Sequence, residues 1–303
     1  MAEILEEYNR GASDKLKSFP AMLTDGDRAI YFHAGKHFRF RGSIIDGGCF
    51  VGGTTTALIE GLCQDPALRK RDEARRLIRV YDLFLIDDDY VLRHLMEHYP
   101  DRSFKGETSF LSVFEENLRG SADLLDVRAG DVTAIGYRDL EPIEIFGVDF
   151  CKALPVTDFV VREFFPRLIQ DALVIQQDFV HEFHPHIHLS MMRLQDHLAK
   201  AVELKWGGSF AFRCIKPISR QTILERFGQD SSWYSEISTN VKLLRELIDS
   251  ALYDENRWVL LLTLGIYYQS VGRLDEARAA YKEARAKYPQ FEPSGLTQQM
   301  IGA

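Results

Sequence analysis

The sequence has no long apolar run and no segment typical of an exported protein. No stretch of its 303 residues approaches the roughly 18 consecutive apolar residues that a membrane-spanning helix requires. The acidic start, MAEILEEYNR, lacks the basic and apolar regions of a signal peptide. We therefore expect a cytoplasmic protein that has no membrane partner.

Cysteine is scarce and positive charge is in deficit. The four cysteines form no CxxC pair, so neither a zinc cage nor a disulfide framework is indicated, and we expect them to be reduced, buried and inert. Lys and Arg number 37 against 45 Asp and Glu, which gives a formal net charge of −8. Because nucleic-acid-binding domains carry a basic patch or stripe, this balance disfavours nucleic acid as the main partner.

Short apolar runs alternate with helical patterns over most of the chain. Residues 1–41 are predicted to be a helical lead-in. Strands are predicted at 43–46, 77–84, 124–131, 143–150, 172–179 and 209–217, and helices between them at 54–62, 89–99, 109–118 and 158–168. Strands separated by helical segments of ten or more residues indicate βαβ units. We therefore predict an α/β fold with a doubly wound, mainly parallel sheet in residues 42–218.

The strand-like runs stop after Pro217, and residues 219–303 are predicted to be a helical extension. Within it, residues 258–291 match the tetratricopeptide pattern at seven positions: Leu264, Gly265, Tyr268, Ala277, Tyr281, Ala284 and Pro289. A single helix pair of this kind cannot bury both of its faces, so we expect it to pack on the main domain or on a second subunit of a homo-oligomer. An ordinary helical hairpin with fortuitous matches is the alternative.

The first predicted strand runs into a glycine-rich turn, Asp46-Gly-Gly-Cys-Phe-Val-Gly-Gly-Thr54, and a helix follows. Glycines let backbone amides approach a ligand closely, and the N-terminus of the next helix offers unpaired N–H groups. The turn therefore predicts a site for a nucleotide-like ligand. It lacks the GxGxxG pattern, which disfavours the alternative of an NAD-dependent dehydrogenase.

This turn resembles the first motif of class I S-adenosylmethionine-dependent methyltransferases, an acidic residue followed by alternate glycines. Asp46, Gly48 and Gly52 match the motif, and Phe50 stands at the middle glycine. The resemblance implies a seven-stranded, Rossmann-like sheet and S-adenosylmethionine as the cofactor. It also implies a set of cofactor-binding residues: Asp46, Gly47, Gly48, Gly52 and Thr54 in the turn, Asp82 at the ribose hydroxyls, and Asp131 of Gly130-Asp131 at the adenine.

Polar residues end the fourth and fifth predicted strands. The fourth ends in Asp149, with Lys152 three residues later, and the fifth in Gln177-Asp178. Because the carboxyl ends of parallel strands meet at one edge of a sheet, we expect these groups beside the cofactor. Lys152 is a candidate base if desolvation lowers its pKa. The alternative is a lysine that keeps its charge in solvent near an aspartate.

The arrangement of these strand ends resembles catechol O-methyltransferase and, more closely, the macrocin O-methyltransferase family of sugar O-methyltransferases, over roughly residues 40 to 215. That resemblance implies Mg²⁺ held by Asp149, Gln177 and Asp178, where the metal would lower the pKa of the acceptor hydroxyl. Gln177 takes the place of a carboxylate, so the site carries one negative charge fewer.

Four histidines follow the fifth predicted strand directly, His181, His184, His186 and His188. His181 is a candidate general base, because its unperturbed pKa lies close to the working pH. One alternative is a polar loop over the site. Another is zinc or iron held by the last three histidines at alternate positions of an extended segment. A further pair, His33 and His37, shares one face of a predicted helix, and we expect structural or surface roles for it.

The sequence therefore predicts methyl transfer from S-adenosylmethionine to an oxygen of a sugar or other polyhydroxylated small molecule. Asp149, Lys152 and His181 are the predicted catalytic residues, and a nitrogen acceptor is the nearest alternative. The alternative from a different class is a scaffold that keeps the fold without activity and acts through its helical tail. The two departures from the family pattern, Phe50 and Gln177, motivate it.

Overall fold

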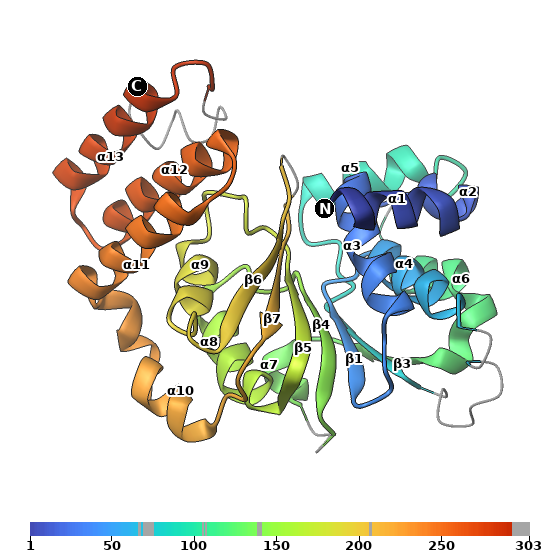
Figure 1. Cartoon of the computed structure of the whole chain (residues 1–303). Helices are drawn as coiled ribbons and strands as arrows, with labels where there is room; N and C mark the ends of the chain where they lie inside the picture. Colours follow the sequence, from blue (N-terminus) through green and yellow to red (C-terminus); the bar gives the residue numbers. More distant parts are fainter. Residues whose placement is uncertain are drawn as a thin grey trace. The chain divides into compact units, whose positions relative to one another are not determined.

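The computed structural model of the protein describes residues 1–65, 68, 76–104, 106, 108–137, 141–205 and 208–292. Its strands form a seven-stranded sheet in the order β3-β2-β1-β4-β5-β7-β6 (Figure 1). The strands are β1 (Ser43–Gly47), β2 (Ile78–Asp82), β3 (Leu125–Ala129), β4 (Ile143–Val148), β5 (Leu168–Gln176), β6 (Leu198–Glu203) and β7 (Phe210–Cys214). β1 pairs in parallel with β2 and β4, β2 with β3, and β6 pairs antiparallel with β7. The predicted α/β fold with a mainly parallel sheet is confirmed.

The chain divides into two compact units, Met1–Phe150 with Arg167–Ile175, and Cys151–Pro166 with Gln176–Ala303. The helices of the first unit are α1 (Ala2–Gly11), α2 (Asp14–Lys17), α3 (Asp25–Lys36), α4 (Gly53–Leu62), α5 (Asp89–His98), α6 (Leu111–Asn117), η3 (Arg119–Leu124) and α7 (Val132–Ile135). Those of the second are α8 (Leu154–Glu163), α9 (Pro185–Met192), α10 (Arg220–Phe227), η5 (Ser231–Ser235), α11 (Ile237–Ser250), α12 (Asp254–Ser270) and α13 (Leu274–Lys287), and the short η4 (Phe165–Arg167) precedes β5. The domain boundaries proposed from the sequence, after residues 41 and 218, stay a prediction.

The lead-in is helical, and glycine brings α3 close to α4. α3 begins at a capping box, in which the Thr24 side chain accepts from the Asp27 N–H and the Asp27 carboxylate accepts from the Thr24 N–H. A Cβ atom on Gly35 of α3 would lie 2.2 Å from the carbonyl oxygen of Leu58 in α4. Any side chain at that position would push the two helices apart.

In the second unit, a buried arginine joins the end of α9 to the helices that follow. Arg193 is 7% exposed, and its guanidinium donates to the carbonyls of Arg226 (2.5 Å) and Trp233 (2.9 Å) and to Asn240 Oδ1 (2.8 Å). It also pairs with the Glu236 carboxylate at 2.9 Å. A buried cation is tolerated only when it is paired and hydrogen-bonded in this way, so Arg193 orders the chain around it.

The predicted helix pair of the tail is α12 and α13, which pack against each other with α11 beside α12 (Figure 1). A Cβ atom on Gly265 of α12 would lie 2.3 Å from the ring of Tyr281 in α13, so two positions of the matched pattern form the contact between the helices. Its identification as a tetratricopeptide motif stays a prediction, and residues 293–303 of the predicted extension lie outside the described residues.

Three local predictions are wrong. The helix predicted at 158–168 ends as α8 at Glu163, and β5 already begins at Leu168, because Pro166 cannot continue a helix. β6 was missed, since its sequence LAKAVE has no apolar run. Cys63 is exposed, whereas the other three cysteines are buried, and all four are free thiols.

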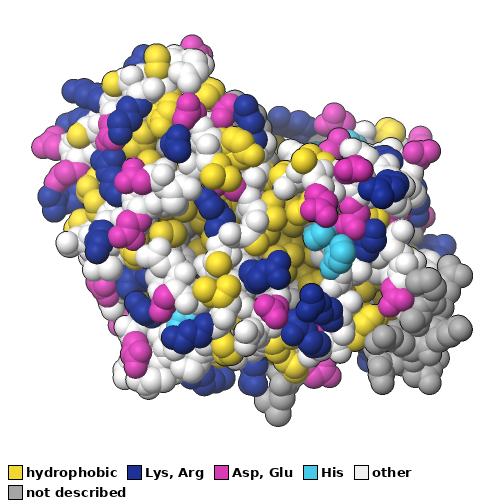
Figure 2. Space-filling model, in the orientation of Figure 1, with side chains coloured by type: hydrophobic (Ala, Val, Ile, Leu, Met, Phe, Trp, Pro, Cys, Tyr) yellow, Lys and Arg dark blue, Asp and Glu magenta, His cyan; other side chains and the backbone are white. Residues whose placement is uncertain are grey.

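The surface carries mixed charge. Figure 2 shows Lys and Arg side chains interspersed with Asp and Glu over the face that it draws. Among the described residues, no helix is both long enough and apolar enough to span a bilayer.

Candidate functional site

The carboxyl ends of β1, β2 and β4 meet around the glycine turn of the first unit. Gly47 of β1 pairs with the residues that directly precede Asp82 and Asp149 in the two neighbouring strands. Gly48 therefore lies between these two carboxylates. Its φ is +81°, and a Cβ atom there would lie 2.7 Å from the backbone carbonyl carbon of Asp149. The position requires glycine.

The rest of the turn is equally tight. A Cβ atom on Gly47 would lie 1.6 Å from the ring of Phe150, and Gly52, with φ +99°, is the N-cap residue of α4. Phe50 stands between them with φ +51°, in the left-handed region that few non-glycine residues adopt. The turn thus holds a phenylalanine in a glycine-like backbone conformation.

Asp46 fixes the turn to the helix that follows it. Its carboxylate is 1% exposed and accepts hydrogen bonds from Thr54 Oγ1 (2.9 Å) and Thr55 Oγ1 (2.6 Å). Burial raises the pKa of Asp46 to about 7, and the charges of Asp149 and Asp82 add to that rise, while the threonine hydrogen bonds oppose it. Two of the predicted cofactor-binding residues, Asp46 and Thr54, thus contact each other. Their role toward a ligand would be to hold the glycine turn in place.

Asp82 lies at the end of β2, where its carboxylate accepts two backbone hydrogen bonds. The N–H groups of Phe50 (2.9 Å) and Phe84 (2.7 Å) donate to its two oxygens. Burial raises the pKa of Asp82 to about 6. The Cys49 thiol is a third donor to this carboxylate. A carboxylate has about four lone-pair sites, so capacity remains for a ligand hydroxyl. The Phe84 contact had no signal in the sequence.

Asp131 is exposed and caps α7, because its carboxylate accepts from the N–H and the hydroxyl of Thr133, both at 2.8 Å. The preceding Gly130 donates its N–H to the backbone carbonyl of Asp82 at 2.8 Å. The Gly130-Asp131 pair therefore lies next to the end of β2, in the first unit with the glycine turn.

Two further groups of the site were not predicted from the sequence. Tyr31 of α3 is fully buried, and burial together with the charges of Asp46 and Asp149 raises its pKa well above the ordinary value. The ring of Phe50 packs on Phe110 and on His94 of α5, with centroid distances of 5.1 and 5.5 Å. Both contacts depend on tertiary packing that no local pattern encodes.

In the second unit, Lys152 forms an ion pair with Asp178. Half of the Lys152 side chain is exposed and a quarter of that of Asp178. The neighbouring Gln177 is buried and neutral. Lys152 thus lies beside an aspartate at the surface of the second unit, and its role as a base stays a prediction.

The predicted magnesium ligands comprise Asp149 of the first unit and Gln177 and Asp178 of the second. The one carboxylate of the second unit in this set, Asp178, is neutralised by the Lys152 ammonium. The other second-unit residue of the set, Gln177, is a neutral amide. Mg²⁺ in proteins is bound mainly through carboxylates and phosphates, so the second unit by itself offers it little free charge, and the magnesium site that includes Asp149 stays a prediction.

The histidine cluster is partly helical, which corrects the expectation of an extended segment. Pro185 begins α9, as proline at the first helical position favours. His186 and His188 are buried, and their Nε2 atoms lie 3.1 and 2.8 Å from the carbonyl oxygens of Cys151 and Phe179. The side-chain groups with metal-ligand geometry among the described residues do not include these histidines, so the zinc or iron alternative is not supported.

The other two histidines of the cluster are only partly buried. The rings of His181 and His184 stack with centroids 5.7 Å apart. Burial lowers the pKa of His184 to about 3 and also lowers that of His181, and the Lys152 charge adds to both shifts. Both imidazoles are therefore neutral at physiological pH. His181 is a neutral base beside an ammonium group.

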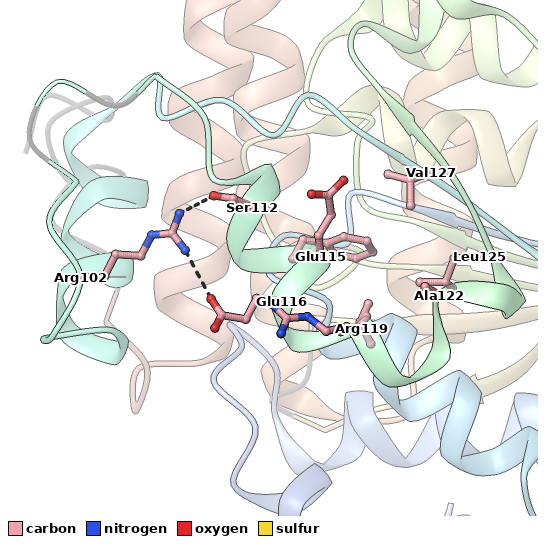
Figure 3. Close-up of a pocket in the computed structure, with 10 residues that line it drawn as sticks. Arg102, Ser112, Glu115, Glu116, Arg119, Ala122, Leu125 and Val127 are labelled. Atoms are coloured by element: carbon pink, nitrogen blue, oxygen red, sulfur yellow. Dashed lines mark hydrogen bonds and ion pairs between the residues drawn. The ribbon is translucent and has the colours of Figure 1, made fainter.

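A separate cavity of about 540 Å³ lies in the first unit, over α6, η3 and the edge strand β3 (Figure 3). Arg102 hydrogen-bonds Ser112 and pairs with Glu116 at 3.7 Å along its wall. The described residues that line this cavity include none of the predicted site residues.

No model of a known protein family and no curated protein sequence matches this chain. Among solved structures, the chain is similar to the apo structure of CalS11, a TDP-rhamnose 3'-O-methyltransferase of calicheamicin biosynthesis, at 13% identity and a TM-score of 0.43, over 70% of this chain and 91% of that one. It is also similar to a "putative O-methyltransferase" from Klebsiella pneumoniae, at 13% identity and a TM-score of 0.40, over 71% and 89% of the two chains. At this level of similarity, neither match carries a substrate over to this chain.

Proposed function

We propose that the protein transfers a methyl group from S-adenosylmethionine to an oxygen of a sugar or other polyhydroxylated small molecule. The observation that carries the proposal is the glycine turn of the first unit, around which Asp46, Asp82 and Asp149 converge. These acidic groups give the site a negative potential that complements a sulfonium cation, and protonation of Asp46 near neutral pH lessens it. Asp82 retains acceptor capacity for a ribose hydroxyl.

The end strands of the sheet also favour this function over NAD-dependent hydride transfer. Dinucleotide-binding folds of the doubly wound type have the parallel order 3-2-1-4-5-6. Here β7 is inserted before β6, and the two are antiparallel.

The chemistry assigned to the protein is placement and deprotonation of the acceptor. S-adenosylmethionine would supply the methyl group from its sulfonium, and the acceptor hydroxyl must lose its proton as the new bond forms. His181 is neutral at physiological pH and can take that proton. Lys152, which adds to the pKa shift of His181, would stabilise negative charge on the acceptor oxygen.

We further propose that the reaction does not depend on magnesium. The Lys152 ammonium already neutralises Asp178, and Gln177 supplies no charge. In this proposal the lysine provides the positive charge that Mg²⁺ would provide in the sugar O-methyltransferase family that the sequence resembles.

The test is transfer of isotope-labelled methyl groups to a panel of nucleotide sugars, free sugars, polyols and amines. We expect labelled product with a hydroxylated acceptor, equal rates with EDTA and with Mg²⁺, and a rate at least about 100-fold lower for His181→Gln. His37→Gln, an exposed histidine of α3's C-cap, is the matched control and should retain the wild-type rate. Labelling of amines alone would refute the oxygen acceptor, and loss of activity in EDTA would refute the metal-free reaction.

One observation favours the scaffold as a second candidate. Phe50 occupies the turn in a left-handed conformation, and its N–H binds the same carboxylate that a ribose would use. A scaffold would show no gain in thermal stability with S-adenosylmethionine, whereas a ligand bound only by the native state raises the melting temperature by mass action.

A further inference from the structure

Helix α5 carries a second group of potential ligands in the first unit, apart from the glycine turn. His94, Glu97 and His98 are spaced i, i+3 and i+4, which places all three on one face of the helix. One ligand atom of each lies within 4.8 Å of those of the other two. The two imidazole rings are tilted by 58° with centroids 4.3 Å apart.

His94 also has unused hydrogen-bonding capacity. Within the described part of the chain, its Nε2 atom is buried without a hydrogen-bond partner. A buried polar atom without a partner is destabilising, so a ligand for this ring would stabilise the folded protein. An imidazole coordinates a cation through a ring nitrogen that carries no proton, and the Nε2 atom of His94 has no competing donor among the described residues. Glu97 and His98 are exposed, which leaves the face open to an incoming ion.

A comparable group of two histidines and a glutamate on α1 and α3 differs in that a lysine already pairs with its carboxylate. Glu7, His33 and His37 also come together, but Lys36 Nζ lies 2.7 Å from Glu7 Oε1. Burial alone would raise the pKa of Glu7, yet hydrogen bonds from Lys36, His33 and His37 lower it to about 2. This carboxylate is already neutralised by an ammonium and joins α1 to α3 as a structural contact. At α5 the described residues place no ammonium within ion-pair distance of Glu97.

We propose that α5 is a binding site for a divalent transition-metal ion of the zinc class, with His94 and His98 as nitrogen ligands and Glu97 as an oxygen ligand. Two imidazoles and one carboxylate are a donor set that Zn²⁺ accepts, with water completing a tetrahedral site. Because His94 packs on Phe50, the ion would lie next to the glycine turn.

The experiment is calorimetric titration of the chelator-treated, full-length protein with Zn²⁺ at pH 7.5. We expect one ion per chain. His98→Gln should weaken binding by at least about 100-fold, because loss of even an outer-shell partner of a metal ligand costs 10- to 100-fold in affinity. The matched control is His37→Gln, which removes the exposed histidine of the other group and should change the affinity by less than about twofold.

Thermal melting without metal would check that both variants fold, which their exposed positions favour. Zn²⁺ affinity of the wild type should also fall when the pH is lowered to 5.5, because protons compete for the imidazoles. Absence of zinc binding to the wild type would overturn the proposal. So would wild-type affinity in His98→Gln, or a loss that follows His37→Gln instead. None of these outcomes depends on methyl transfer.

Discussion

Replacing Asp46 with asparagine should raise the free energy of unfolding, relative to that of the wild type, as the pH rises. Burial raises the pKa of this carboxyl from an ordinary 3.8 to about 7. Between these values the folded protein binds a proton that the unfolded chain releases, so the free energy of unfolding of the wild type falls as the pH rises. Asparagine cannot titrate and has no such dependence.

The magnitude follows from the size of the shift. One pKa unit corresponds to about 1.36 kcal/mol, so the whole shift amounts to roughly 4 kcal/mol, of which about 2.5 kcal/mol develops between pH 5 and pH 8. Asp46 is 1% exposed, so solvent screens this cost little. The amide also loses part of the hydrogen bonding, but that loss does not change with pH.

Urea denaturation of the wild type and Asp46→Asn at several pH values measures the difference directly. We expect the stability of the variant relative to the wild type to rise by about 2.5 kcal/mol from pH 5 to pH 8. Thr55→Val removes a hydrogen bond that lowers the pKa of Asp46, so it should extend the pH-dependent loss to higher pH. If the free energies of unfolding of the wild type and Asp46→Asn change with pH in parallel, the assignment of a buried, proton-binding carboxyl is refuted.

Three other predictions concern packing and histidine ionisation. Arg193→Met should lower the free energy of unfolding by about 3–5 kcal/mol in urea, since it leaves the buried Asn240 amide oxygen and the carbonyls of Arg226 and Trp233 without their donor. The exposed ion pair of Arg226 should contribute less than about 1 kcal/mol when that residue is changed to alanine. Gly35→Ala should lower the free energy of unfolding by about 1–3 kcal/mol, because the added methyl group forces α3 away from α4. The control, Gly120→Ala, should be nearly neutral, since no atom lies within 4 Å of the added Cβ. Equal melting temperatures for the two variants would contradict the close packing. Because the pKa of His184 is lowered to about 3, its imidazole should stay neutral at pH 5 in an NMR titration. The unfolded chain takes up this proton near pH 6.5, so the free energy of unfolding should fall as the pH drops below about 6.5. Protonation of the folded protein near pH 6.5 would show that the ring is not buried.

The strand ends and the glycine turn were predictable because they depend on short-range patterns. Apolar runs that end in Asp46, Asp82 and Asp149 identify the carboxyl ends of three strands, and parallel pairing then brings those ends to one edge. Gly48 was predictable for the same reason, since a turn between close strands leaves no room for a side chain.

The partners of these groups were not predictable, because they come from distant parts of the chain. Tyr31 belongs to the lead-in, and His94 reaches Phe50 from a helix more than 40 positions later. Alternate spacing of the histidines predicts an extended segment, and this prediction is wrong because Pro185 begins a helix there. The Lys152 ion pair was visible in the sequence only as one of two alternatives.

The central claim is that the glycine turn and Asp82 bind S-adenosylmethionine. Calorimetric titration with S-adenosylhomocysteine, with and without Mg²⁺, tests it most directly on the wild type and on Asp82→Ala. We predict binding in the micromolar range that is unaffected by Mg²⁺, and that the variant weakens by at least about 10-fold through loss of hydrogen bonds to a charged acceptor. If the wild type does not bind, or the variant binds equally well, the cofactor site assigned to β1 and β2 is wrong and the scaffold takes its place.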